Sequence, residues 1–241
     1  MSGDLLFISY TRSMNRIALI PLFFFLLLSC SKPKNAYRID GYASNAEQGE
    51  TITLSRSPDG VSLEPLSRCA IRNGRFGFQG NIESEGIGYL CSNIPQKRGC
   101  TMFFIEKGLL KVYIDSSGCR IAGTPTNDLA TIVEDSIEHY IAGMAVVEEL
   151  CYSASPDSVT LVSLGIEGLC RQEMLVDYLR RTINGNIGNL LGLYLLVTYS
   201  EFFTTEELSS LKEKIPPSSI DRSDNPLYDL LTEIMQERQF K

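Results

Sequence analysis

The sequence predicts an α+β protein in which an N-terminal antiparallel β-sandwich or barrel is followed by an all-α segment. Two observations predict this order, and a third predicts export. Residues 36–125 contain short runs of β-branched and aromatic residues, separated by Gly, Asn and Pro at the spacing of a sandwich. In residues 126–241, apolar residues recur every three or four positions, which is typical of amphipathic helices. A short apolar segment near the N-terminus has the features of an export signal.

The N-terminal segment predicts export and lipidation. The apolar run Ile17–Leu28 has 12 residues and follows Arg12 and Arg16, whereas a bilayer-spanning helix needs about 20 apolar residues. The run ends in Leu-Leu-Ser-Cys30, which resembles a lipobox, because a small residue precedes a cysteine whose thiol accepts a diacylglyceryl group. A core strand or helix that ends at a chance cysteine is the alternative, and the N-terminal position and basic flank disfavour it. We therefore expect residues 1–29 to be a signal peptide.

Residues 30–35 are then a lipidated tether, with Cys30 carrying the acyl chains (palmitate or similar) that attach the protein to a membrane. Each buried methylene contributes about 0.8 kcal/mol, so several chains make the attachment effectively permanent. No acidic cluster follows Cys30, which favours an outer-membrane location facing the periplasm over export to the cell surface. The compact signal starting at Met14 predicts translation from Met14 rather than Met1.

Composition disfavours nucleic acid as a partner. The 241-residue chain has a net charge of −7, and the part after residue 29 has 20 basic and 28 acidic residues, a formal charge of −8. An acidic surface repels phosphate backbones, and the sequence shows no basic stripe interleaved with aromatic residues.

The β-region contains one strong turn signal. Asn73 and Gly74 both tolerate positive φ, as a two-residue type I′ hairpin requires. This turn predicts the cross-strand pairs Arg72–Arg75, Ile71–Phe76 and Cys69–Phe78, with the last two pairs on one buried face. The predicted strands are Tyr37–Ala43, Thr51–Arg56, Leu66–Arg72, Arg75–Gly80, Gly88–Cys91, Thr101–Glu106, Leu109–Asp115 and Cys119–Ala122.

The helical region begins at Thr126, with Asn127 and Asp128 where a cap and a first-turn acid belong. Ser155-Pro156-Asp157 interrupts the first helix near Cys151. Further helices are predicted over Ser158–Ile183 and Leu190–Ser200, from Thr204 to just before Pro216, and over Pro226–Phe240.

Four motifs resemble one family: Tyr37–Gly41, Arg72–Gly80, Phe103–Gly108 and Ile121–Asp128. They look like the β-rich domain of unknown function that precedes the thioredoxin module in AhpC/TSA-family thiol–disulfide oxidoreductase lipoproteins of Bacteroidota. Residues 184–191 and 204–211 resemble the helical segment of that family. The chain has no Trp and no C-x-x-C pair, so the family's catalytic residues have no counterpart here. The resemblance therefore implies a fold, a compartment and a thioredoxin-like partner acting in trans.

Six cysteines follow Cys30, namely Cys69, Cys91, Cys100, Cys119, Cys151 and Cys170, and they allow 15 connectivities. Cys91 and Cys100 flank a loop that a disulfide between them could close, and two free buried thiols are an equal alternative. Cys151 and Cys170 lie on consecutive helices with an expected axial offset of about 13 Å, which exceeds disulfide reach.

No motif predicts catalysis, a metal or a cofactor. His139 is the only histidine, whereas a catalytic zinc site usually has more than one, and no G-x-S-x-G elbow is present. We therefore expect a non-enzymatic envelope lipoprotein that acts as a binding or interaction module. A thiol-redox enzyme that uses cysteines outside a C-x-x-C motif is the alternative.

Overall fold

The computed structural model describes residues 36–44, 46–57, 62–82, 86–94, 98–152, 157–217 and 225–239. The predicted signal peptide (1–29), Cys30 and the rest of the tether to residue 35 lie outside the described residues.

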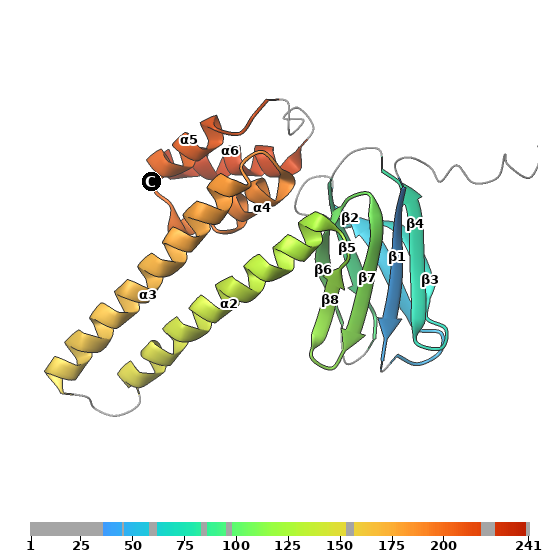
Figure 1. Cartoon of the computed structure of the whole chain (residues 1–241), viewed down its shortest axis with the longest axis horizontal. Helices are drawn as coiled ribbons and strands as arrows, with labels where there is room; N and C mark the ends of the chain where they lie inside the picture. Colours follow the sequence, from blue (N-terminus) through green and yellow to red (C-terminus); the bar gives the residue numbers. More distant parts are fainter. Residues whose placement is uncertain are drawn as a thin grey trace, which may run out of the picture.

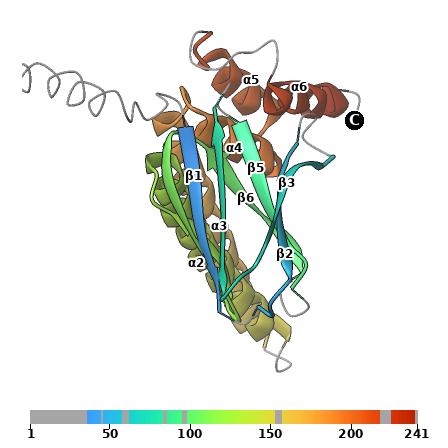
Figure 2. The same ribbon diagram turned by 90° about the vertical axis from the view of Figure 1, so that its right-hand side faces the viewer.

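Eight strands form two four-stranded sheets that face each other (Figures 1 and 2). Sheet A has the order β4-β1-β7-β8 and sheet B the order β3-β2-β5-β6. The α+β fold class is confirmed, although β1 and β7 pair in parallel, unlike the other ladders. The strands are β1 (Ala36–Ala43), β2 (Thr51–Arg56), β3 (Glu64–Ala70), β4 (Arg75–Asn81), β5 (Gly86–Ser92), β6 (Gly99–Ile105), β7 (Gly108–Asp115) and β8 (Gly118–Ala122).

The space between the sheets is an apolar core. On β1 and β7, alternate residues such as Ile39, Leu110 and Val112 are at most 1% exposed, whereas the residues between them face outward. This period of two follows from strand geometry, in which successive side chains point to opposite faces. Each sheet therefore has one face in the core and one outer face, and the outer face of sheet A carries the first candidate site.

The turn at Asn73–Gly74 is confirmed, with φ of 51° and 70°, and Arg72 forms a bridge with Arg75. The expected continuation of this hairpin is wrong, because β3 pairs with β2 in sheet B and β4 pairs with β1 in sheet A. Ile71 and Phe76 are nevertheless buried in the same core, as is Phe78, and Cys69 packs against it. A two-residue turn fixes only the first pair, and longer ladders with other strands then separate its two arms.

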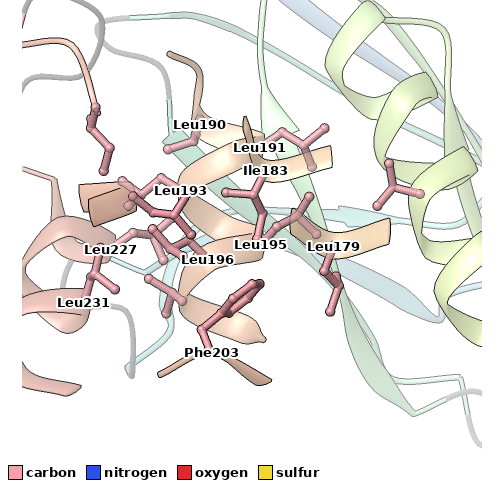
Figure 3. Close-up of a cluster of buried hydrophobic side chains, with 14 of the residues drawn as sticks. Leu179, Ile183, Leu190, Leu191, Leu193, Leu195, Leu196, Phe203, Leu227 and Leu231 are labelled. Carbon is pink, nitrogen blue, oxygen red and sulfur yellow. The ribbon is translucent and has the colours of Figure 1, made fainter. Parts of the chain in front are cut away.

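The helical part has five α-helices and one 3₁₀ turn in the described residues, close to the predicted positions (Figure 1). Helix α4 lies at the centre of an apolar core that includes Leu179, Leu193, Leu196 and Phe203 (Figure 3). The elements are α2 (Pro125–Tyr152), α3 (Ser158–Gly185), α4 (Leu190–Thr198), η1 (Ser200–Phe202), α5 (Thr205–Glu213) and α6 (Pro226–Gln239).

The sandwich and the helices are joined at the start of α2. Asn127 does not cap the helix, which begins two residues earlier at Pro125; it is 4% exposed and pairs with strand β6. Its side chain accepts a hydrogen bond from the Phe104 N–H (2.9 Å) and donates one to the Phe104 carbonyl (2.8 Å). Glu106 accepts hydrogen bonds from the first-turn N–H groups of Thr126 and Asn127. Since β6 is an edge strand of sheet B, this network satisfies part of its open edge.

Candidate binding surfaces

The first candidate site is a groove of about 860 Å³ on the outer face of sheet A and the adjoining strand β3. Five basic residues and a single acidic residue line this basic groove, together with two tyrosines. The charged and aromatic lining residues are Arg38, Asp40, Tyr42, Arg68, Arg72, Arg75, Lys111 and Tyr113.

Strand register brings these residues together. Asp40 and Tyr42 of β1 lie opposite Lys111 and Tyr113 of β7, and Tyr42 also lies opposite Arg75 of β4. These positions alternate with the buried residues of the same strands, so their side chains share the outer face. Tyr42 and Tyr113 are 45% and 50% exposed.

Most of the positive charge in the groove is unneutralised. Arg38 pairs with Asp40 at 2.8 Å, and Arg68 donates to the Thr53 hydroxyl at 3.3 Å. Within the described parts of the chain, Arg72, Arg75 and Lys111 form no ion pair. Arg72 and Arg75 face each other across the Asn73–Gly74 turn, where like charges destabilise the pairing. An anion in the groove would remove this repulsion.

This stripe of basic residues and tyrosines was not predicted from the sequence, because its members come from four segments that are distant in sequence. The available signal was weak. Arg38, Asp40 and Tyr42 alternate on one predicted strand, and Lys111 and Tyr113 alternate on another. Only the pairing of β1 with β7 shows that the two sets are neighbours.

The second candidate site is the distal half of the α2–α3 hairpin, which projects away from the sandwich and from α4–α6 (Figure 1). In α3, none of the residues from Ser158 to Met174 is buried, and Val147 is the only buried residue in the last turns of α2. We call the apolar side chains in this region that are at least 42% exposed the apolar tip: Ile141, Val146, Leu150, Tyr152, Val159, Leu161, Val162, Ile166, Leu169 and Met174. Such a surface is typical of a protein interaction site.

The hairpin around the apolar tip carries only negative charge. Between His139 and Cys170 the sequence contains no Lys or Arg. The four acidic residues in this stretch are Glu148, Glu149, Asp157 and Glu167. The Glu167 carboxylate is bound by Arg171, one turn further along α3, at 2.7 Å. The basic groove is therefore mainly positively charged, whereas the apolar tip is bordered by negative charge.

One pair of the described cysteines is a disulfide. Cys91 and Cys100, the candidate pair from the sequence, are directly opposed in β5 and β6 and are joined in it. Cys151 and Cys170 are both free, in agreement with their predicted separation. Cys69 and Cys119 are half-buried on β3 and β8 and are not in disulfides.

His139 lies on the exposed side of α2, with its ring centroid 6.3 Å from that of Tyr140. Among the residues that the structure describes, no group of three or more His, Cys, Asp or Glu side chains is arranged to hold a metal ion. None of the described helices is long and apolar enough to cross a membrane.

The strongest tyrosine pKa shift belongs to the junction between the two parts. Burial raises the pKa of Tyr194 to about 12, with Glu134 adding to the shift. The Tyr194 ring packs edge-on against Phe104 of β6 at 5.7 Å between centroids. Tyr194 therefore stays protonated at neutral pH and serves as a packing residue between α4 and sheet B. Burial also raises the pKa of Glu134, and Glu138 and Asp135 contribute repulsion.

Residues 37–130 match the model of a domain of unknown function, DUF4369. The match covers nearly the whole of the eight-stranded sandwich and the first residues of α2, and the remaining helical part lies outside it. A search of curated proteins finds no match to the chain. The sandwich is therefore similar to DUF4369 domains, and this similarity does not extend to the helical part beyond the start of α2.

Proposed function

We propose that this chain is a non-enzymatic lipoprotein of the cell envelope, attached through Cys30 and binding a partner protein with the apolar tip. The observation that carries the proposal is the exposure of this tip. A helix that is apolar over most of its surface is normally buried, yet α3 has no buried residue before Leu175. Binding a partner would bury this surface, at about 25 cal/mol for each Å² removed from water.

The charge around the tip favours a different protein over a second copy of this chain. Two hairpins packed side by side would bring Glu148 and Glu149 close to the same acidic residues of the other copy, and such repulsion opposes association. The partner we propose is an envelope protein with an apolar groove bordered by Lys or Arg. The resemblance described above makes a thioredoxin-like protein acting in trans the leading candidate.

Site-specific photocrosslinking from Val159 in the native envelope tests the proposal. We expect one crosslinked partner protein, and we expect Val162→Glu with Ile166→Glu to abolish the crosslink, because two carboxylates would enter an apolar interface. Asn184→Glu with Gln236→Glu is the matched control, because it adds the same charge at exposed positions of α3 and α6 that lie outside the tip. A crosslink that persists in the tip variant, or a product containing two copies of this chain, would contradict the proposal.

Attachment to the membrane is tested separately by intact-mass measurement of the protein extracted from the envelope. We expect a chain that begins at Cys30 and carries acyl groups, and we expect Cys30→Ser to lack them. An unacylated native chain that retains residues 17–29 would refute both the lipidation and the expected outer-membrane location facing the periplasm.

The Cys91–Cys100 disulfide is the pair on which the thiol-redox alternative can be tested. It joins two neighbouring strands, and Cys100 is exposed to a reductant. An exposed disulfide is easier to reduce than a buried one. Alkylation of the native protein with and without mild reductant, followed by mass measurement, distinguishes the two functions. Rapid reversible cycling of this pair would favour the enzyme, and an inert pair would favour the binding module.

A further inference from the structure

We infer that the basic groove binds the phosphate groups of anionic phospholipids, so that the outer face of sheet A rests on a membrane surface. This inference concerns a different surface from the apolar tip. It depends on the proposed function in one respect, namely that attachment at Cys30 brings the groove close to the membrane.

The charge distribution requires an explanation that folding does not supply. The chain is acidic overall, yet five basic residues and a single acid line this groove. Arg72 and Arg75 are directly opposed, which costs stability in the free protein. A bound phosphate would offset that repulsion, because each guanidinium can donate two hydrogen bonds to its oxygens.

The tyrosines favour a membrane interface over a free ion. Tyr42 and Tyr113 lie side by side on β1 and β7, and about half of each side chain is exposed. Tyrosine is enriched at the headgroup level of membranes, because its ring is apolar and its hydroxyl is polar. The groove also lies across the outward face of a sheet, and this open shape suits a planar array of headgroups.

The short stretch of sequence between Cys30 and the groove is consistent with contact between the groove and the membrane. Arg38 follows Cys30 by eight residues, a stretch that spans at most about 28 Å when fully extended. A chain attached at Cys30 would therefore keep the outer face of sheet A within reach of the headgroups. Each basic residue held near an anionic surface improves binding about 5-fold.

Vesicle co-sedimentation of the full chain carrying Cys30→Ser tests the inference without any contribution from acylation. Vesicles of phosphatidylcholine alone are compared with vesicles that also contain phosphatidylglycerol. We expect stronger binding to the anionic vesicles, with a loss of about 30-fold in Arg72→Gln with Arg75→Gln. Arg181→Gln with Lys214→Gln is the control, because it removes the same charge from the helical part and should leave binding unchanged.

Inorganic phosphate at constant ionic strength separates the two sources of phosphate. Phosphate that fails to compete supports a membrane surface as the ligand. Competition at low concentration would overturn the inference and identify a soluble phosphate compound instead. Equal binding to both kinds of vesicle, or equal losses in the groove and control variants, would also overturn it. Acylation is tested by intact mass and the partner protein by photocrosslinking. A negative result in the vesicle assay therefore refutes lipid binding by the groove without refuting the proposed function.

Discussion

The two halves of helix α3 have opposite surroundings. Its C-terminal part supplies Leu175, Leu179 and Ile183, each 0% exposed, to the core around α4. Figure 3 labels Leu179 and Ile183 in this core. Its N-terminal half, from Ser158 to Met174, has no buried residue although it is rich in apolar side chains. The same helix therefore stabilises the fold at one end and presents the apolar tip at the other.

This difference separates stability from binding along one continuous element. Burial of apolar surface at the base of the hairpin contributes to the free energy of folding, whereas the tip contributes little until a partner covers it. Regions with few buried contacts also open locally at low cost. Substitutions along the hairpin, and at the junction that supports it, test whether the base stabilises the fold and the tip does not.

The largest effect is expected for Leu179→Ala in the base. Removing a fully buried leucine side chain should lower the free energy of unfolding by about 3 kcal/mol, through lost burial and the cavity left behind. Urea denaturation followed by circular dichroism measures this change. A loss below 1 kcal/mol, on the order of a surface substitution, would mean that the helical core is not the main source of stability.

A smaller effect is expected at the junction, for Asn127→Ala. The substitution removes both hydrogen bonds to Phe104 and leaves its buried backbone groups without these partners, at a cost of about 2 kcal/mol. Asn184→Ala is the matched control, because its side chain is exposed, where it donates to the carbonyl of Arg180 and accepts from the ammonium group of Lys214. Equal denaturation midpoints for the two variants would argue against a structural role for the junction.

The charge of Glu207 of α5, which pairs with Arg180 in the base of the hairpin at 2.7 Å, should give a pH-dependent effect. Its pKa is lowered, first by the hydrogen bond from the Thr204 backbone N–H in the capping box and then by Arg180. A carboxylate with a lowered folded pKa stabilises the protein above its unfolded value of 4.5, and the contribution disappears as the pH falls through the folded pKa.

Glu207→Gln isolates this effect, because glutamine preserves the capping-box hydrogen bonds. We expect the variant to be less stable at pH 7, by less than about 1 kcal/mol because the pair is partly exposed to solvent. The two proteins should become equally stable below the folded pKa. Thermal melts across this pH range measure the difference, and a constant gap at all pH values would contradict the assignment.

The smallest effect is expected for Ile166→Ala in the apolar tip. The Ile166 side chain is 64% exposed, so the free energy of unfolding should change by less than about 0.5 kcal/mol. Truncation of a buried leucine or isoleucine in the base of the hairpin should cost much more. The same denaturation assay provides the measurement. A loss comparable to that of Leu179→Ala would show that the tip is already buried in the purified protein.

Much of the fold was predictable from local patterns. The alternation of residues predicted every described strand, and the apolar spacing predicted each of the five described α-helices to within a few residues, but not the 3₁₀ turn η1. The parallel pairing of β1 with β7 was not predictable, because the two strands are distant in sequence and each shows an ordinary alternating pattern. Likewise, the Asn73–Gly74 dipeptide predicts a turn but does not determine which sheet each arm joins.

The candidate sites were less predictable than the fold. Exposure of the apolar tip could not be foreseen, since an apolar spacing of three and four predicts a helix face without saying whether anything covers it. The basic groove depends on long-range register, as the pairing of Asp40 with Lys111 illustrates. Asn127 was placed at the correct helix end, but its pairing with Phe104 depends on the position of an edge strand.

The position of β1 inside sheet A has a mechanical consequence. The described chain begins at Ala36 in a strand that is hydrogen-bonded on one side to β4 and on the other to β7. A pull transmitted from the N-terminal side would act along the strand and load both ladders in shear, so that many backbone hydrogen bonds must break together. A terminal strand at a sheet edge would peel away one bond at a time. The domain is thus built to resist tension from the end at which we propose it is tethered.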